Sequence, residues 1–147
     1  MIVRDGEGVS RFVTVNIHGA RTAGEAVAAA RAIANSPLVK TSWCGGDPNW
    51  GRILCALGYS KATVNESRID IGYAKPGSRE MVFVFRRGRP TDVDLKTLGK
   101  ISTAREFDLH VDLNLGPANF TMYASDLTED YVAFNRRYES DPASLGG

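Results

Sequence analysis

The most constraining feature of this sequence is the stretch from Lys40 to Ser60, KTSWCGGDPNWGRILCALGYS, which packs more special-purpose residues together than any other part of the chain. Residues 45–49 read Gly-Gly-Asp-Pro-Asn, and because glycine permits a positive φ while proline fixes its own, this run predicts a tight irregular loop. Apolar side chains then recur at helical spacing, which predicts a helix with Asn49 as its N-cap. These apolar residues are Trp50, Ile53, Leu54 and Leu57.

Two interpretations of this loop remain open. A helix N-terminus collects free backbone N–H groups, so the loop could bind an anion with help from Arg52. Alternatively, the loop is a rigid corner whose Trp43 and Trp50 close one edge of the core. No phosphate-binding loop of the G-x-x-x-x-G-K-[ST] type occurs in the sequence, and the chemistry alone therefore favours the corner.

The rest of the chain alternates helical and strand patterns. Thr22 and Glu25 form a capping box in front of an alanine-rich helix that Asn35-Ser36-Pro37 should end. Alternating apolar residues, or short apolar runs, predict the remaining strands, and a hairpin is expected across Gly116-Pro117. The expected fold is α+β, a mostly antiparallel sheet with helices packed on one face. The expected strands are 11–18, 68–73, 80–86, 107–115 and 119–124, and the further helices are 95–101 and 127–138.

Composition excludes several classes of protein. The chain has 18 basic and 17 acidic residues and a formal charge of +1, so it gives no support for nucleic-acid or membrane-surface binding. The local basic run at residues 86–89 is interpreted as a solvated strand end. Cys44 and Cys55 have no partner at metal-binding spacing, so free thiols and no metal site are expected. Without a leader or an apolar run of membrane-spanning length, we expect a cytoplasmic protein.

Four sequence blocks in one order resemble a known family. They are IVRDGEG at 2–8, AIANSPLVKT at 32–41, DPNWGRI at 47–53 and SDLTEDYVAFNRRY at 125–138. Together they are similar to the C-terminal part of the ornithine acetyltransferase family of arginine biosynthesis, also called glutamate N-acetyltransferase. The resemblance runs to about residue 140, which implies one domain over residues 1–140. Residues 141–147 lack periodicity, so a mobile tail is expected there.

The resemblance implies a two-step acetyl transfer that needs no cofactor. The family makes a threonine nucleophile by self-cleavage, and that threonine carries the acetyl group of N-acetylornithine to glutamate. The matching blocks lie downstream of the family's nucleophile, and Thr14 sits inside a strand pattern. We therefore expect no catalytic residue in this chain, and no acetyl transfer by the chain alone.

The residues that the resemblance assigns to the chain bind substrate. Glu7 matches the family's carboxylate in D-G-E-G, which pairs with a substrate ammonium. Asn135 and Ser140 match the family's Asn and terminal Thr or Ser, which hydrogen-bond an amino-acid end group. From the residues alone, Glu7 is an ordinary loop carboxylate, Asn135 a helix-surface amide and Ser140 a helix C-cap.

Three functions follow from these observations. The first is the substrate-binding segment of an ornithine acetyltransferase, with N-acetylornithine and glutamate as substrates and with the upstream part of the same enzyme, in an oligomer, as partner. The second is a non-catalytic binding or assembly module of the same fold. The third is an anion- or nucleic-acid-binding domain that uses Arg52 and residues 86–89, which would require steeply salt-dependent binding.

Overall fold

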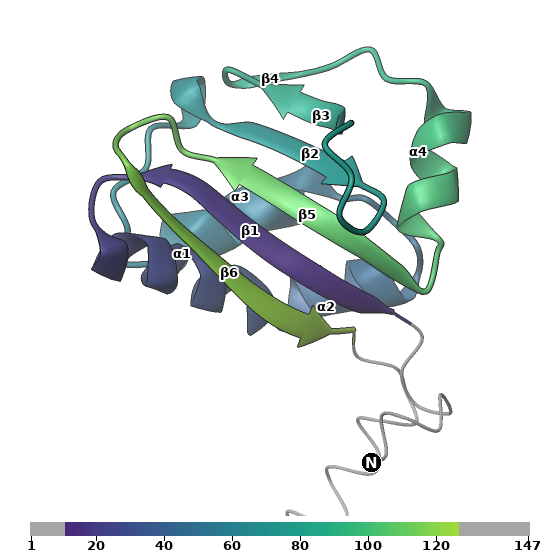
Figure 1. Cartoon of the computed structure of the whole chain (residues 1–147), viewed down its shortest axis with the longest axis horizontal. Coiled ribbons are helices and arrows are strands. Elements are labelled where there is room, and N and C mark those ends of the chain that lie inside the picture. The colour runs from purple at the N-terminus through teal and green to yellow at the C-terminus, as the bar shows by residue number, and fades with distance from the viewer. Residues whose placement is uncertain (1–10, 127–147) are drawn as a thin grey trace, which may run out of the picture.

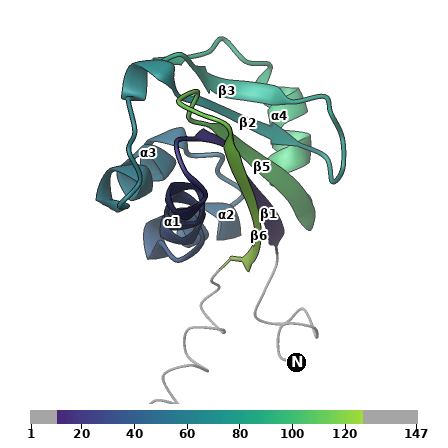
Figure 2. The same cartoon turned by 60° about the vertical axis from the view of Figure 1, so that its left-hand side comes forward.

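A computed structural model describes residues 11–126, and its centre is a six-stranded sheet in the order β4-β3-β2-β5-β1-β6. Figures 1 and 2 show α1, α2 and α3 together on one side of this sheet. The strands are β1 (Phe12–Ala20), β2 (Asp70–Ala74), β3 (Val82–Arg86), β4 (Arg89–Pro90), β5 (Glu106–Asp112) and β6 (Ala118–Ser125). The helices are α1 (Ala23–Ala34), α2 (Pro37–Cys44), α3 (Trp50–Tyr59) and α4 (Leu95–Ser102), with a 3-10 turn at Glu66–Arg68.

The sheet is mixed, which corrects the prediction of a mostly antiparallel one. β1 and β5 pair in parallel, with Val13 opposite Phe107 and Ile17 opposite Val111. The expected hairpin between residues 107–115 and 119–124 is also wrong, because β1 lies between β5 and β6 and pairs antiparallel with β6. A turn signal shows that the chain reverses, but it does not show which strand it will pair with.

The period-2 pattern of β1 decides which face of the sheet is buried. Val13, Val15 and Ile17 are at most 2% exposed, whereas the residues between them are only half-buried. On α1, the alanines at 26, 29 and 30 are fully buried, and their small side chains let the helix lie close to β1 and β6. The alanine content of α1 therefore sets its close packing against the sheet.

Aromatic side chains fill the core between the sheet and α2 and α3. Trp43 meets Phe107 edge to face, with ring centroids 6.5 Å apart, and Trp50 stacks on Phe85 at 4.9 Å. Such pairs add to the stabilisation from area burial by about 0.5–1.5 kcal/mol each. The loop at 45–49 is thus the corner that places two tryptophans against the sheet.

The start signals of the helices are confirmed by their caps. The side chain of Thr22 accepts from the Glu25 backbone N–H, and that of Asn49 accepts from the Arg52 N–H. Helix α2 was not predicted, although Ser36 caps it and Pro37 is its first residue. The Ser-Pro pair ends one helix and starts the next, so its stop signal hid its start signal.

Candidate functional site

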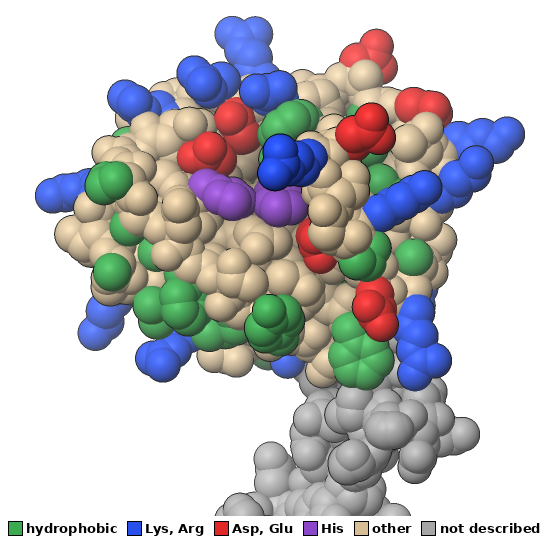
Figure 3. Space-filling view, viewed as in Figure 1, with side chains coloured by type: hydrophobic (Ala, Val, Ile, Leu, Met, Phe, Trp, Pro, Cys, Tyr) green, Lys and Arg blue, Asp and Glu red, His purple; other side chains and the backbone are tan. Residues whose placement is uncertain are grey.

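The face of the sheet opposite α1, α2 and α3 is the functional face suggested by the structure. It is the face toward the viewer in Figure 1, and in the space-filling view of Figure 3 two histidines lie side by side on it with charged side chains around them. Two hollows lie on this face. The first, about 310 Å³, is lined by His18, Asp70, Met81, Phe83, Arg86, Arg87, His110, Asp112 and Asn114. The second, about 280 Å³, is lined by Phe12, Val13, Thr14, Pro76, Glu106, Phe107, Asp108, Tyr123 and Ala124.

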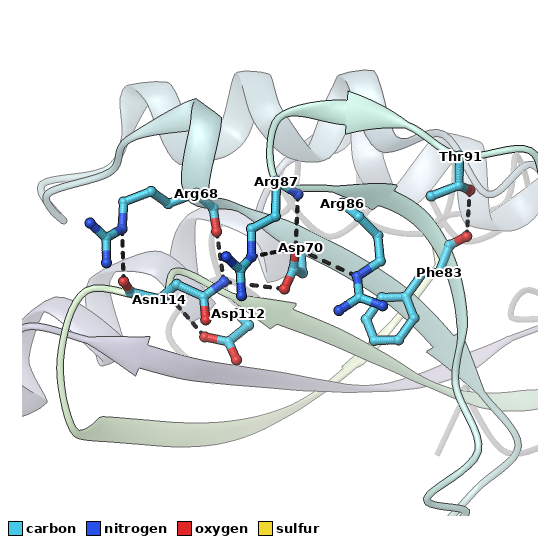
Figure 4. Close-up of polar contacts among 8 residues, drawn as sticks. All are labelled: Arg68, Asp70, Phe83, Arg86, Arg87, Thr91, Asp112 and Asn114. Atoms are coloured by element: carbon cyan, nitrogen blue, oxygen red, sulfur yellow. Dashed lines mark hydrogen bonds and ion pairs between the residues drawn. The ribbon is translucent and has the colours of Figure 1, made fainter.

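Asp70 forms the floor of the first hollow, and its side chain is only 7% exposed. It lies directly across from Asp112 in the antiparallel ladder, an arrangement that like charges disfavour. Two cations offset this repulsion, because the Nε atoms of Arg86 and Arg87 lie 3.8 and 3.6 Å from Asp70 Oδ1. Figure 4 shows both guanidinium groups directed toward this carboxylate.

A two-residue turn brings the arginines there. Arg87 and Gly88 both have positive φ, at 48° and 82°, and connect β3 to β4, where Arg86 pairs with Arg89. Two successive positive φ values are the signature of a type I′ hairpin turn. In this conformation the Arg87 backbone N–H donates to Asp70 Oδ1 at 2.9 Å, which fixes the turn over the hollow.

Asn114 connects the residues on the opposite rim of the first hollow through hydrogen bonds. Its side-chain Nδ2 donates to the Arg68 carbonyl at 2.7 Å and to Asp70 Oδ2 at 3.2 Å, and its backbone N–H donates to Asp112 Oδ1 at 2.9 Å. Its φ of 53° is one that asparagine tolerates better than most residues. Both carboxylates at the floor therefore accept hydrogen bonds from the protein itself.

The two histidines meet because β1 and β5 are parallel neighbours. His18 Nε2 lies 3.0 Å from His110 Nδ1, and the rings are stacked with an interplanar angle of 13°. One nitrogen donates and the other accepts, so this contact requires at least one neutral ring. Burial lowers the pKa of His110 below its ordinary 6.5, the neighbouring His18 lowers it further, and Asp108 opposes both effects.

This lowered pKa makes the stability depend on pH. The unfolded chain protonates His110 more readily than the folded chain, so between the two pKa values the unfolded state holds more protons and stability rises with pH. We expect the urea midpoint to fall as the pH is lowered through and below 6.5. The slope of that fall should be smaller in His110→Gln, and equal slopes in the two proteins would contradict the assignment.

A third feature joins the two ends of the described chain. The Arg11 N–H donates to Asp126 Oδ1 at 3.1 Å, and the Asp126 N–H donates to the Arg11 carbonyl at 3.2 Å. Asp126 is completely buried. Burial lowers the pKa of nearby Lys40, and the charge of Asp126 opposes that shift. This pair, which we call the terminal junction, holds the start of β1 beside the end of β6.

The sequence-predicted site residues lie beyond this junction. Glu7, Asn135 and Ser140 are outside the described residues, as is the expected helix 127–138. Thr14 belongs to β1, as expected, and lines the second hollow. Arg52 Nη1 donates to the Leu38 carbonyl at 2.9 Å, so one of its donors is used within the protein.

Other expectations concern metals and membranes. Cys44 and Cys55 are free thiols, and residues 11–126 contain no group of three or more His, Cys, Asp or Glu side chains placed to hold a metal ion. Within the same residues, no helix has both the length and the hydrophobicity to cross a bilayer. The first hollow was missed because its residues come from four strands and the connections beside them and share no local motif. Only the paired basic residues at 86 and 87 signalled it.

Comparisons with known proteins identify the family. The sequence profile of the ArgJ family matches residues 1–140. The mitochondrial arginine biosynthesis bifunctional protein ArgJ of Schizosaccharomyces pombe is 41% identical, over 95% of this chain and 32% of its own length. The glutamate N-acetyltransferase of Methanocaldococcus jannaschii is 40% identical, over 94% of this chain and 35% of its own length.

A solved structure agrees with the sequence comparisons. The crystal structure of the arginine biosynthesis bifunctional protein ArgJ from Bacillus halodurans superposes with a TM-score of 0.80 and 36% identity, covering 93% of this chain and 62% of that one. The chain spans about a third of the length of the curated relatives named above. The profile match over nearly the whole chain and the shared fold together show that this chain belongs to the ArgJ family.

Proposed function

We propose that this chain is the C-terminal substrate-binding segment of an ornithine acetyltransferase that transfers an acetyl group from N-acetylornithine to glutamate. The observation that carries the proposal is the terminal junction, together with the family match. Covalent geometry limits Glu7 to within about 14 Å of Arg11, and Asn135 to within about 32 Å of Asp126. Because Arg11 and Asp126 are hydrogen-bonded, these limits allow both residues to reach one site near the terminal junction.

The second hollow supports a substrate site near this place. Phe12, the residue after Arg11, lines it together with Thr14 and Tyr123. Asp108 also lines this hollow, but its Oδ2 accepts from the Gly77 N–H at 2.9 Å and is thereby engaged by the protein. A substrate ammonium would instead pair with Glu7, whose carboxylate carries the opposite charge and matches the family's substrate-binding carboxylate.

The proposed chemistry is a covalent exchange on a threonine outside this chain. The threonine hydroxyl loses its proton to the threonine's own α-amino group and attacks the acetyl carbonyl of N-acetylornithine. The C–N bond breaks, the ornithine amine takes the proton, and an acetyl ester remains on the threonine. The glutamate amine then attacks that ester, which gives N-acetylglutamate and restores the hydroxyl. This chain contributes by binding and orienting both amino acids.

Glu7→Gln tests the proposal in the enzyme completed by the threonine-bearing part. A charge-assisted hydrogen bond contributes about 1.5–3 kcal/mol, so KM for N-acetylornithine should rise about 10- to 150-fold. Glu80→Gln makes the same chemical change at an exposed site and should leave KM unchanged. If Glu7→Gln stays within twofold of the unaltered enzyme, Glu7 is a loop carboxylate and its role is withdrawn.

Asn135→Ala makes a different prediction. N-acetylornithine and glutamate share the backbone of an α-amino acid, so the loss of a neutral hydrogen bond to that part should weaken both substrates, by about 0.5–1.5 kcal/mol each. Ser140→Ala is expected to act in the same direction. KM and kcat for both substrates, measured on variants with unchanged melting behaviour, provide the comparison. An effect on only one substrate would contradict the shared-end assignment.

The second candidate is a non-catalytic assembly module, and the open sheet face favours it. Tyr123 on β6 is 81% exposed on that face, where another part of a longer protein could pack. The variants above separate the two functions. A module that serves assembly alone would tolerate Glu7→Gln, Asn135→Ala and Ser140→Ala without change in KM.

A cytoplasmic location also stays a prediction, since the name of the Schizosaccharomyces pombe relative places that protein in mitochondria.

A further inference from the structure

We propose that the first hollow binds a small organic anion, through a carboxylate or phosphate head group held by Arg86 and Arg87. The hollow lies at the end of β1 away from the terminal junction, since His18 lines it and lies six residues, or roughly 20 Å, along the strand from Phe12. It is therefore a different part of the open face from the second hollow.

The acidic groups at the floor of the first hollow already accept hydrogen bonds from the protein. Asp70 accepts from the Arg87 backbone N–H and from Asn114 Nδ2, and Asp112 accepts from the Asn114 N–H. A cation entering the hollow would have to compete with these donors. The carboxylates thus hold the arginines in place and are poor ligands for a metal ion or an amine.

Arg86 and Arg87 retain free hydrogen-bond donors. Each faces Asp70 through Nε, and among residues 11–126 neither makes a hydrogen bond through its terminal amino groups. Arg86 lies with its guanidinium carbon 3.9 Å from the centroid of the Phe83 ring. Stacking on a ring leaves the edge of the guanidinium group available, and that edge matches the two oxygens of a carboxylate or phosphate.

The other walls suit an anion that carries a short apolar part. Met81 and Phe83 line one side of the hollow. On the other side, His18 and His110 use one nitrogen each for their mutual bond and keep the second ring nitrogen. His110 Nε2 is buried and has no hydrogen-bond partner among the described residues. A volume of about 310 Å³ fits a small metabolite-sized molecule.

The simpler interpretation is that Arg86 and Arg87 only neutralise Asp70 and Asp112. It predicts that added anions will bind no better at the hollow than at other exposed arginines. Arg31 provides the matched comparison, because it is exposed on α1, which lies on the other side of the sheet. Arg31→Gln removes one positive charge, as Arg86→Gln does, but at a place away from the hollow.

The test titrates the full 147-residue chain with inorganic phosphate and, separately, with succinate, at constant ionic strength. NMR follows the arginine Nε–H signals and the histidine ring protons. We expect saturable shifts of the Arg86, Arg87 and His18 signals, and the anion that binds more tightly identifies the head group. Arg86→Gln should weaken binding about tenfold or more, and Arg31→Gln less than twofold.

Two results would overturn the proposal. One is the absence of saturable shifts with both anions. The other is equal weakening by Arg86→Gln and Arg31→Gln, which would show general charge attraction. If Arg86→Gln does not fold, the histidine ring protons of the unaltered protein still decide the question, because phosphate or succinate in the hollow must shift them and binding elsewhere must not.

Discussion

Gly19→Ala should lower the free energy of unfolding by about 2–5 kcal/mol, one of the two largest effects expected for this protein. Gly19 has a φ of +70°, a conformation that costs a residue with a Cβ about 1–2 kcal/mol. An added Cβ would also lie 2.7 Å from the Asn114 backbone nitrogen and against the Asp112 carboxylate. Backbone cannot move aside as a flexible side chain can, so overpacking adds about 1–3 kcal/mol.

Gly77→Ala is the matched control for this prediction. Gly77 has nearly the same φ, +75°, but no atom lies within 4 Å of the position its Cβ would take. Gly77→Ala should therefore lower the free energy of unfolding only by the conformational cost, about 1–2 kcal/mol. Urea unfolding of both variants gives the comparison. Equal losses would mean that the crowding at Asn114 relaxes without cost and that the rim of the first hollow is not rigid.

The Gly19 region also shows what the sequence could not reveal about the fold. The connection between β5 and β6 wraps the end of β1, since the Leu113 N–H donates to the His18 carbonyl at 2.8 Å and the Leu115 N–H to the Gly19 carbonyl at 2.8 Å. Gly116-Pro117 correctly predicted a reversal of the chain. The partner of the returning strand, however, is about 100 residues away, and pairing at that separation leaves no local signal.

Features with a local cause were predicted correctly. The N-caps at Thr22 and Asn49 each depend on residues within three positions of one another, and the structure contains both. Glu25, the other half of the predicted capping box, instead accepts from the Thr63 N–H through Oε1 at 2.9 Å. The β1 alternation predicted its buried face for the same reason. Local rules failed at Ser36-Pro37, where one pair of residues carries two signals because it ends α1 and begins α2.

Local sequence patterns could likewise predict only part of the candidate site. The His18–His110 pair and the Asp70–Asp112 pair arise from the strand order, in which β5 lies between β1 and β2. Before that order is known, these residues are separate polar positions in separate strands. The roles of Glu7, Asn135 and Ser140 were assigned from a resemblance to a family and not from local physics. The variants described above are therefore required to test them.

Asp126→Ala is the second large effect, with an expected loss of about 2–4 kcal/mol in the free energy of unfolding. The substitution removes a completely buried carboxylate that accepts from the Arg11 N–H. It also leaves Lys40 without the negative charge that opposes its desolvation. Removing one partner of a buried charged contact leaves the other polar groups buried without that partner. This lowers the free energy of unfolding more than removing both partners would.

Two further variants make this prediction specific. Asp126→Asn keeps an acceptor oxygen and loses only the charge. It should therefore lower the free energy of unfolding by less than Asp126→Ala does. Asp92→Ala removes an exposed carboxylate and should change stability by less than about 0.5 kcal/mol. In the completed enzyme, Asp126→Ala should also raise KM for both substrates, because the terminal junction holds the two ends that carry Glu7 and Asn135. A loss of stability with KM unchanged would show that the junction supports the fold but does not position the substrate residues.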